Sequence, residues 1–337
     1  MSDTPLQADR DKAFAFLKAQ ARWRWPEIAL WAFAFASILL MPSRALLINE
    51  IAILALFALS LDLILGYAGI VSLGHGAFFG VGAYTAGLLA KAGAGAAPLS
   101  DPTLGLLAAG ATAAMIGYAT SFLVLRGNDL TKLMVTLGIA LIFQELANKF
   151  SDITGGADGL QGVTPAKVLG LFDFDIYGKT AAFYSVTVLF LLFCAARVIV
   201  HSPFGISLRA IKGNALRARA IGVPVDARLR AIYTLAAAYA GVAGALLAQT
   251  TAQVSLDVLE FHRSADTLLI VVLGGVGTLY GAVVGAAAFK MMYDFISSYT
   301  QQYWQFWLGL ILVVLVLFVR GGIMGLIARL TGQEERA

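Results

Sequence analysis

Charged residues are scarce in this sequence, and their scarcity excludes a large class of proteins. Asp, Glu, Lys and Arg together make up 13% of the 337 residues, whereas hydrophobic residues make up 59%. Soluble domains carry roughly 25% charged residues, which help to keep their surfaces wetted. A water-soluble globular fold is therefore excluded, and a chain largely embedded in a membrane is indicated.

Cysteine and histidine are almost missing as well. Cys194 is the single cysteine, so neither an intrachain disulfide nor a cysteine-based zinc cluster can form. The three histidines are scattered, and we expect no metal site. The formal net charge of +4 would suit nucleic acid, but in a membrane protein an excess of Lys and Arg is typical of cytoplasmic loops. We therefore expect no nucleic-acid partner.

The motifs of soluble enzymes are also missing. Gly178-Lys179-Thr180 resembles the end of a P-loop, but Asp173 stands where the loop requires its first glycine. Gly275-x-Gly277 lacks the third glycine of a dinucleotide site because Tyr280 occupies that position. The sequence thus offers no means of hydrolysing ATP and no catalytic centre, and we predict that the chain is not an enzyme.

Long stretches without any charge predict membrane-spanning helices. Each of these stretches is about long enough for one span, since ~20 apolar residues cross a ~30 Å hydrocarbon core. Backbone groups in hydrocarbon must bond within the protein, and the stretches do not alternate as barrel strands do. Five such uncharged stretches lie between Asp62 and Lys91, Asp101 and Arg126, Arg230 and Asp257, Asp266 and Lys290, and Asp294 and Arg320.

These stretches predict an all-α, polytopic membrane helical bundle of about ten crossings. We leave open whether the eighth segment crosses the membrane or re-enters from one side. The expected segments are Glu27–Pro42, Ala45–Leu65, Ile70–Ala90, Thr103–Leu125, Leu130–Phe150, Thr180–Val200, Ala231–Thr250, Ala265–Gly275, Leu279–Ser297 and Trp304–Val319.

Two of the expected helices follow glycine-rich breaks, and these breaks predict a transport path. Gly76-Ala77-Phe78-Phe79-Gly80 and Gly281-Ala282-Val283-Val284-Gly285 form an internal echo, which indicates duplicated broken helices of the kind that line such paths. Close helix packing would give the same spacing of small residues. The candidate path residues are Asp62, Gly69, Ser72, His75, Gly76, Gly80, Gly275, Gly277, Thr278 and Gly281.

The distribution of Lys and Arg predicts the orientation of the chain. Residues 201–230 carry six Lys and Arg against the single acid Asp226, so we expect them in the cytoplasm; residues 151–179 carry more acids than cations and should lie outside. With ten crossings, both termini are cytoplasmic. The expected organisation is a basic tail (1–26), a membrane domain (27–320) and a C-terminal tail (321–337).

The basic segment, residues 201–230, has the pattern of two short helices. Phe204, Leu208 and Ile211 fall on one helical face, and Asn214 can cap a second helix over 215–221. Gly222 can end that helix, whose exposed Leu216 and Ile221 would fit a groove on a partner. A loop that lies on anionic lipid headgroups is the alternative.

Several motifs in order resemble the membrane permeases of ATP-driven importers of the branched-chain amino acid type. The resemblance spans roughly residues 50–325. Its motifs are Gly66-Tyr67-Ala68-Gly69, Ser72-Leu73-Gly74-His75-Gly76, Thr154-Gly155-Gly156-Ala157-Asp158-Gly159, Ser202-Pro203-Phe204-Gly205, Arg209-Ala210-Ile211 and Leu273-Gly274-Gly275-Val276-Gly277-Thr278. Asp158 and Lys212-Gly213 depart from the residues that are frequent in that family.

The resemblance implies partners in a bacterial inner membrane. These would be two ATP-binding cassette subunits, which use ATP and Mg²⁺, a second related permease and a periplasmic substrate-binding protein; this chain would bind no cofactor itself. The residues that would couple it to the ATPase are Phe204, Gly205, Leu208, Arg209, Ile211, Asn214, Leu216, Arg219, Ile221 and Gly222. A stand-alone, ion-coupled secondary transporter and an importer of urea, amides or aromatic acids remain the alternatives.

Overall fold

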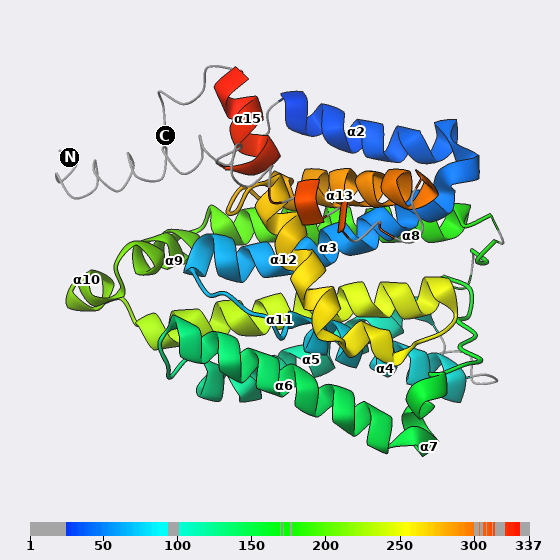
Figure 1. The fold of residues 1–337 in the computed structure, drawn as a ribbon, viewed down its shortest axis with the longest axis horizontal. Coiled ribbons are helices and arrows are strands. Elements are labelled where there is room, and N and C mark those ends of the chain that lie inside the picture. Colours follow the sequence, from blue (N-terminus) through cyan, green and yellow to red (C-terminus); the bar gives the residue numbers. More distant parts are fainter. Residues whose placement is uncertain are drawn as a thin grey trace, which may run out of the picture.

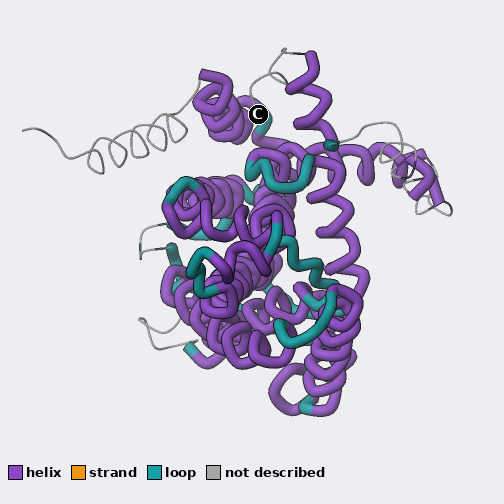
Figure 2. The backbone as a smooth tube through the Cα atoms, turned by 90° about the vertical axis from the view of Figure 1, so that its left-hand side faces the viewer, coloured by secondary structure: helices purple, strands orange, loops and turns teal. Residues whose placement is uncertain are grey.

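The computed structural model is helical throughout its described part, which confirms the predicted all-helical bundle. Figure 2 shows helices joined by loops, and the residues described contain only two isolated β-bridges. The described residues are 25–93, 101–168, 170, 172–175, 177–299, 303, 306–307, 309–311, 313 and 321–330. The predicted tail 1–26 and the expected last crossing therefore fall largely outside the described residues.

The helices fall into long bundle helices and short connecting ones. The long helices are α2 (Trp25–Leu40), α3 (Ala45–Ala68), α4 (His75–Ala92), α5 (Pro102–Val124), α6 (Asp129–Lys149), α8 (Lys179–Val200), α11 (Val225–Thr251), α12 (Phe261–Gly274) and α13 (Tyr280–Tyr299). The short ones are η1 (Pro42–Arg44), α7 (Ser151–Thr154), η2 (Gly156–Asp158), α9 (Pro203–Gly213), α10 (Ala215–Ala220), η3 (Leu256–Leu259) and α15 (Gly322–Leu330).

The centre of the bundle is formed by α3 and α11, as Figure 1 shows. Helix α11 packs on α3, α4 and α5, and α3 also packs on α8, α12 and α13. Small residues allow the backbones to approach closely: a Cβ atom on Gly82 of α4 would collide with the Gly241 backbone of α11. Helix α12 runs obliquely across the direction of its neighbours (Figure 1).

Within the part of the chain that the structure describes, five helical segments are long and apolar enough to cross a membrane. They are Pro42–Ala68, Pro102–Val124, Asp129–Lys149, Lys179–Val200 and Val225–Thr251. Three expected crossings, Thr103–Leu125, Leu130–Phe150 and Thr180–Val200, match these helices to within one residue. The expected crossing Ala45–Leu65 ends three residues before α3 does, and the seventh expected crossing lies within the longer helix α11. The count of ten crossings stays a prediction, because α12 has only 14 residues.

The third expected segment, Ile70–Ala90, is wrong over its first residues. Residues 70–74 are not helical, and α4 begins at His75. This segment contacts α6 instead of continuing a helix: the N–H of Leu73 donates to Thr136 Oγ1 at 3.3 Å. A Cβ atom on Gly74 would collide with the carbonyl of Thr136, so α6 and this segment touch backbone to backbone.

The seventh and eighth expected segments begin too late. Helix α11 begins at Val225 rather than Ala231, because Pro224 precedes its first turn and Asp226 lies within that turn. Helix α12 begins at Phe261 rather than Ala265. In both places charged residues mark where the apolar stretch begins, but the helix itself begins several residues earlier.

The basic segment and the loop formed by residues 151–179 lie at opposite ends of the bundle. Figure 1 shows α9 and α10 at the left end and α7 at the right. This separation is what the predicted topology requires. Which end faces the cytoplasm stays a prediction.

Candidate functional site

The basic segment folds as two helices with the predicted cap. The Asn214 side chain accepts a hydrogen bond from the N–H of Arg217 at 3.0 Å and so caps α10. Gly222 follows α10 with a φ of +86°, a conformation that glycine adopts without strain. The local residue pattern therefore determines the shape of this segment.

The predicted coupling residues divide into two faces. Gly205, Leu208 and Ile211 are buried and attach the segment to the bundle. Leu216 and Ile221 are each 77% exposed, so α10 presents two apolar side chains to its surroundings.

The remaining coupling residues keep the segment in place. The guanidinium of Arg228 lies over the Phe204 ring, 5.2 Å from its centroid. Arg219 pairs with Asp226 at 2.7 Å between its Nη2 and Oδ1 atoms. These contacts hold α9, α10 and the start of α11 together while α10 remains exposed.

Helix α9 contacts the end of α3 directly. The Nζ atom of Lys212 donates a hydrogen bond to the Gly66 carbonyl at 2.7 Å. The guanidinium of Arg209 lies 5.3 Å from the centroid of the Tyr67 ring. A cation at a helix C-terminus satisfies carbonyl groups that have no partner within the helix. Lys212, which departs from the family pattern, thus binds a membrane helix of its own chain.

Helix α3 ends where the glycine-rich sequence predicts a break. Gly69 has a φ of +72°, and the N–H of Ile70 donates to the Ile64 carbonyl at 3.0 Å. This left-handed cap is a common helix terminus. The chain then turns back along the bundle through residues 70–74.

Asp62 joins the two glycine-rich breaks to each other. Its buried carboxylate accepts hydrogen bonds from the N–H of Gly277 at 2.6 Å and from the N–H of Leu279 at 3.1 Å, just before α13. A Cβ atom on Gly66 would meet the Gly277 backbone at 2.6 Å, so the breaks touch backbone to backbone. Thr278 closes its own loop by donating to the Gly275 carbonyl at 2.8 Å.

Of the other predicted path residues, Ser72 lies just before α4 and three lie in its first turns, whereas Gly281 lies in the first turn of α13; all are buried. His75 Nε2 and Ser60 Oγ are 2.9 Å apart, and the His75 ring stacks on Phe57. The N–H of Gly76 donates to Ser264 Oγ at 2.8 Å. Ser72 and Gly80 are buried beside them. The structure thus gathers the predicted residues around two breaks, and their role in a path stays a prediction.

A cavity with charged walls lies between α3, α11, α12 and α13 and was not predicted from the sequence. Its volume is about 560 Å³. We call it the charge-lined cavity, after the acidic and basic residues in its lining. These residues are Glu50, Asp257, His262, Arg263, Asp266 and Lys290. The only sequence signal for it was the i,i+4 spacing of Lys290 and Asp294.

Ion pairs surround this cavity. Lys290 Nζ lies 2.6 Å from Glu50 Oε2 and 3.2 Å from Asp294 Oδ1, so it pairs with one carboxylate on α3 and one on its own helix. Arg263 Nη2 lies 2.5 Å from Asp257 Oδ2. Charges in a membrane are costly, and pairing with an opposite charge lowers that cost.

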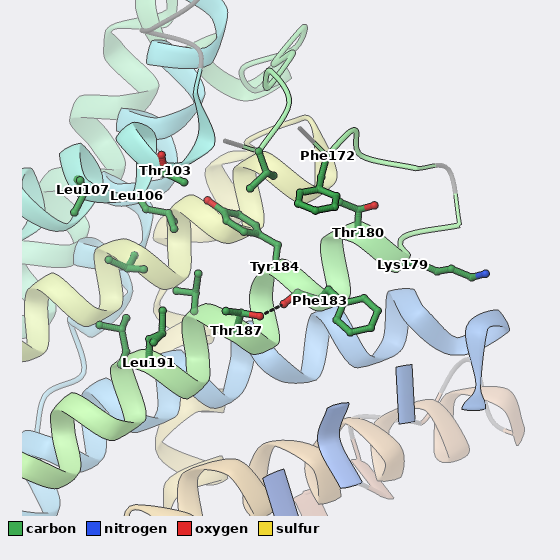
Figure 3. A pocket seen from close by; sticks show the side chains of 14 residues that line it. Thr103, Leu106, Leu107, Phe172, Lys179, Thr180, Phe183, Tyr184, Thr187 and Leu191 are labelled. Carbon is green, nitrogen blue, oxygen red and sulfur yellow. Dashed lines mark hydrogen bonds between the residues drawn. The ribbon is translucent and has the colours of Figure 1, made fainter. Parts of the chain in front are cut away.

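A second cavity is almost purely apolar. This apolar groove, of about 790 Å³, is formed by α5, α8 and α11, with residues of the loop before α8. Figure 3 shows Leu106, Tyr184 and Leu191 facing it, while the Lys179 side chain extends away from them. It is the larger of the two cavities described here, and Lys179 is the one charged residue among those that line it.

A family model for the permease component of branched-chain amino acid transport systems matches residues 43–320. This chain belongs to that family. The predicted resemblance is therefore confirmed, and the permease is a multi-pass membrane protein with apolar spanning helices.

Two relatives show how far the similarity of the permease extends. It is 28% identical to the high-affinity branched-chain amino acid permease LivM of Escherichia coli over 292 residues, covering 80% of this chain and 67% of that protein. It is 30% identical to a probable LivH permease of Methanocaldococcus jannaschii over 254 residues, covering 73% and 78% of the two chains. No solved structure gives a significant match.

Proposed function

We propose that this permease is the LivM-like membrane subunit of an ATP-driven importer that carries branched-chain amino acids across a bacterial inner membrane. The observation that carries the proposal is α10, which presents Leu216 and Ile221 to a partner from a basic segment. An exposed amphipathic helix of this kind fits a groove on another protein. The substrate follows from the relatives, which are named for branched-chain amino acid transport.

The partners follow from the same comparison. Two ATP-binding cassette subunits would use ATP and Mg²⁺, a LivH-like permease would complete the path, and a periplasmic binding protein would deliver the substrate. The similarity to both LivM and LivH relatives supports a pair of related permeases. The chain itself would bind no cofactor, because its task is to move substrate while the ATPases supply the energy.

The proposed orientation places the basic segment and both termini in the cytoplasm. Six Lys and Arg in residues 201–230 support this orientation. Residues 151–179, at the other end of the bundle, would then face the periplasm. Residues 27–320 would form the membrane domain.

The contacts of α9 suggest how ATPase motion would reach the membrane. A displacement of α10 moves α9, and Lys212 moves with it, pulling on the Gly66 carbonyl. Asp62 lies one turn from Gly66 on α3 and binds the loop before α13. The two glycine-rich breaks would therefore shift together as the path opens to alternate sides.

Charged substitutions on α10 test the proposal. Leu216→Asp combined with Ile221→Asp should abolish co-purification of the ATPase subunits, because an apolar groove excludes two buried carboxylates. Ile153→Asp is the matched control: this side chain is exposed and apolar but lies on α7 at the opposite end. If the doubly substituted complex assembles as well as the control, the proposed docking is wrong.

Reconstitution separates this function from a stand-alone, ion-coupled transporter. Vesicles holding the purified permease alone should take up no leucine in an ion gradient, whereas the complete complex should do so with ATP and the binding protein. Uptake by the permease alone would favour the secondary transporter. Comparing leucine with urea, short amides and aromatic acids in the complete system tests the substrate class.

A further inference from the structure

We propose that the charge-lined cavity is a membrane-embedded binding site for one zwitterionic amino acid with an aliphatic side chain. The inference rests on the proposed function for the choice of ligand. The location of the binding site is new, because neither the sequence motifs nor the comparisons assign it. Its volume of about 560 Å³ lies within the range of roughly 300–1,000 Å³ that is typical of small-molecule sites.

The walls of the cavity offer both charges that a zwitterion requires. Glu50 of α3 and Lys290 of α13 face each other across one side, and their side chains are 49% and 17% exposed. Arg263 and Asp266 of α12 line another side. A ligand carboxylate and ammonium are attached to one carbon atom, so they can bind side by side against a Lys–Glu pair with each charge opposite its counterpart.

The floor of the cavity suits an aliphatic side chain. Phe57 of α3, Phe79 of α4 and Phe289 of α13 line it together with the charged residues. Apolar rings beside ion pairs are poorly matched to a cavity that serves only to hold water. Binding an aliphatic side chain against these rings removes its apolar surface from water, which favours the bound state.

The position of the cavity fits a site along a path. Glu50 and Gly66 are sixteen residues apart on α3, which corresponds to about 24 Å along the helix. Glu50, at one side of the cavity, therefore lies far from the contact between α9 and α3. Phe57, which lines the cavity, also stacks on His75 at the start of α4. The ligand would thus rest one side chain away from the first glycine-rich break.

Protection of an introduced cysteine from a water-soluble thiol reagent tests this site. The starting variant is Cys194→Ser, which removes the single native cysteine. Thr251→Cys then places a thiol on the cavity wall, and Ser151→Cys places one on exposed α7 as the control. The assembled complex with both ATPases and the second permease is labelled without the binding protein.

Leucine should slow the labelling of Thr251→Cys and leave that of Ser151→Cys unchanged. At ten times its half-protecting concentration the slowing should be about tenfold, because only about one site in eleven is empty. Leucinol, which lacks the carboxylate, and 4-methylpentanoate, which lacks the ammonium group, should protect poorly. Equal labelling with and without leucine, or equal protection by either analogue, overturns the proposal.

Charge-removing variants locate the ligand within the cavity. Glu50→Gln and Lys290→Met should each abolish protection by leucine. Asp294→Asn is the matched control, since Asp294 contacts Lys290 but does not line the cavity, and this variant should keep the protection. Protection that survives both lining substitutions would overturn the assignment of these two residues.

Uptake by the complete importer separates the two proposals. If ATP-dependent leucine uptake is normal while leucine does not protect Thr251→Cys, the site is wrong and the proposed function stands. If no amino acid is taken up by the complete importer, the proposed function itself fails.

Discussion

Helix α3 carries two carboxylates whose surroundings are opposite. Asp62 is completely buried, and its oxygen atoms accept hydrogen bonds from the backbone of another segment. Glu50 lies twelve residues, or about 18 Å, earlier on the helix. Its side chain is 49% exposed in a cavity and pairs with Lys290, whose ammonium group is carried on a flexible stem. The same chemical group therefore holds a loop at one place and pairs with a cation at the wall of a cavity at the other.

The comparison shows why polar residues in a membrane segment are not one class. A buried carboxylate that binds backbone N–H groups contributes to the fold, because those groups have no other partner. A carboxylate that faces a cavity can exchange its partner for a ligand. Burial and partner type, rather than depth along the helix, distinguish the two.

The largest expected effect is that of Asp62→Ala on stability. The variant leaves the N–H groups of Gly277 and Leu279 without acceptors, and each buried unpaired donor costs about 1–3 kcal/mol. Melting of the detergent-solubilised complex, followed by size-exclusion chromatography after heating, should show a large drop in stability. Asp62→Asn keeps one acceptor oxygen, so its stability should lie between that of Asp62→Ala and that of the unaltered chain. A melting curve for Asp62→Ala that overlays the unaltered chain would contradict the structural role.

An intermediate effect is expected for Lys212→Met, which removes the bond from α9 to the Gly66 carbonyl. The complex should still hydrolyse ATP, but leucine uptake per ATP should fall about tenfold, since a charged hydrogen bond contributes about 1.5–3 kcal/mol and 1.4 kcal/mol is a factor of ten. Lys132→Met removes a comparable cation from α6, where it pairs with Asp129 on the surface, and should leave the ratio unchanged. An unaltered ratio for Lys212→Met would show that α9 does not transmit the motion.

The smallest effect on stability is expected for Glu50→Gln. A half-exposed ion pair contributes about 0–1 kcal/mol, so the melting temperature should stay close to that of the unaltered complex. Leucine uptake should nevertheless fall, because the variant removes a charge from the proposed ligand site. A loss of stability as large as that of Asp62→Ala would mean that the two carboxylates have the same role.

Local features of the fold were predictable because their causes lie within a few residues. Asn214 caps a helix that starts at the next residue, and Gly222 ends it with a positive φ. Gly69 likewise ends α3 beside the glycines that predicted the break. The starts of α4, α11 and α12 were misplaced, because helix starts there depend on packing and capping rather than on the length of the apolar stretch.

The candidate site was only half predictable for the same reason. Lys212 was interpreted only as a departure from the family pattern, but it binds Gly66, 146 residues away. Asp62 was expected near a path, which stays a prediction; its hydrogen bonds to a backbone loop 215 residues away were not foreseen. The charge-lined cavity was missed because Glu50 and Arg263 lie near helix ends, where charges look like ordinary solvent contacts.

The amino-acid sequence by itself determined that this chain is a helical membrane permease with a short, capped helix in its basic segment. Hydrophobicity, helix caps and ordered family motifs are properties of neighbouring residues, so they can be seen without the fold. Only the tertiary structure decided which charges meet. The reason is physical: an ion pair or a buried carboxylate is stabilised by atoms from helices far apart in the chain, and their meeting depends on how the whole bundle packs.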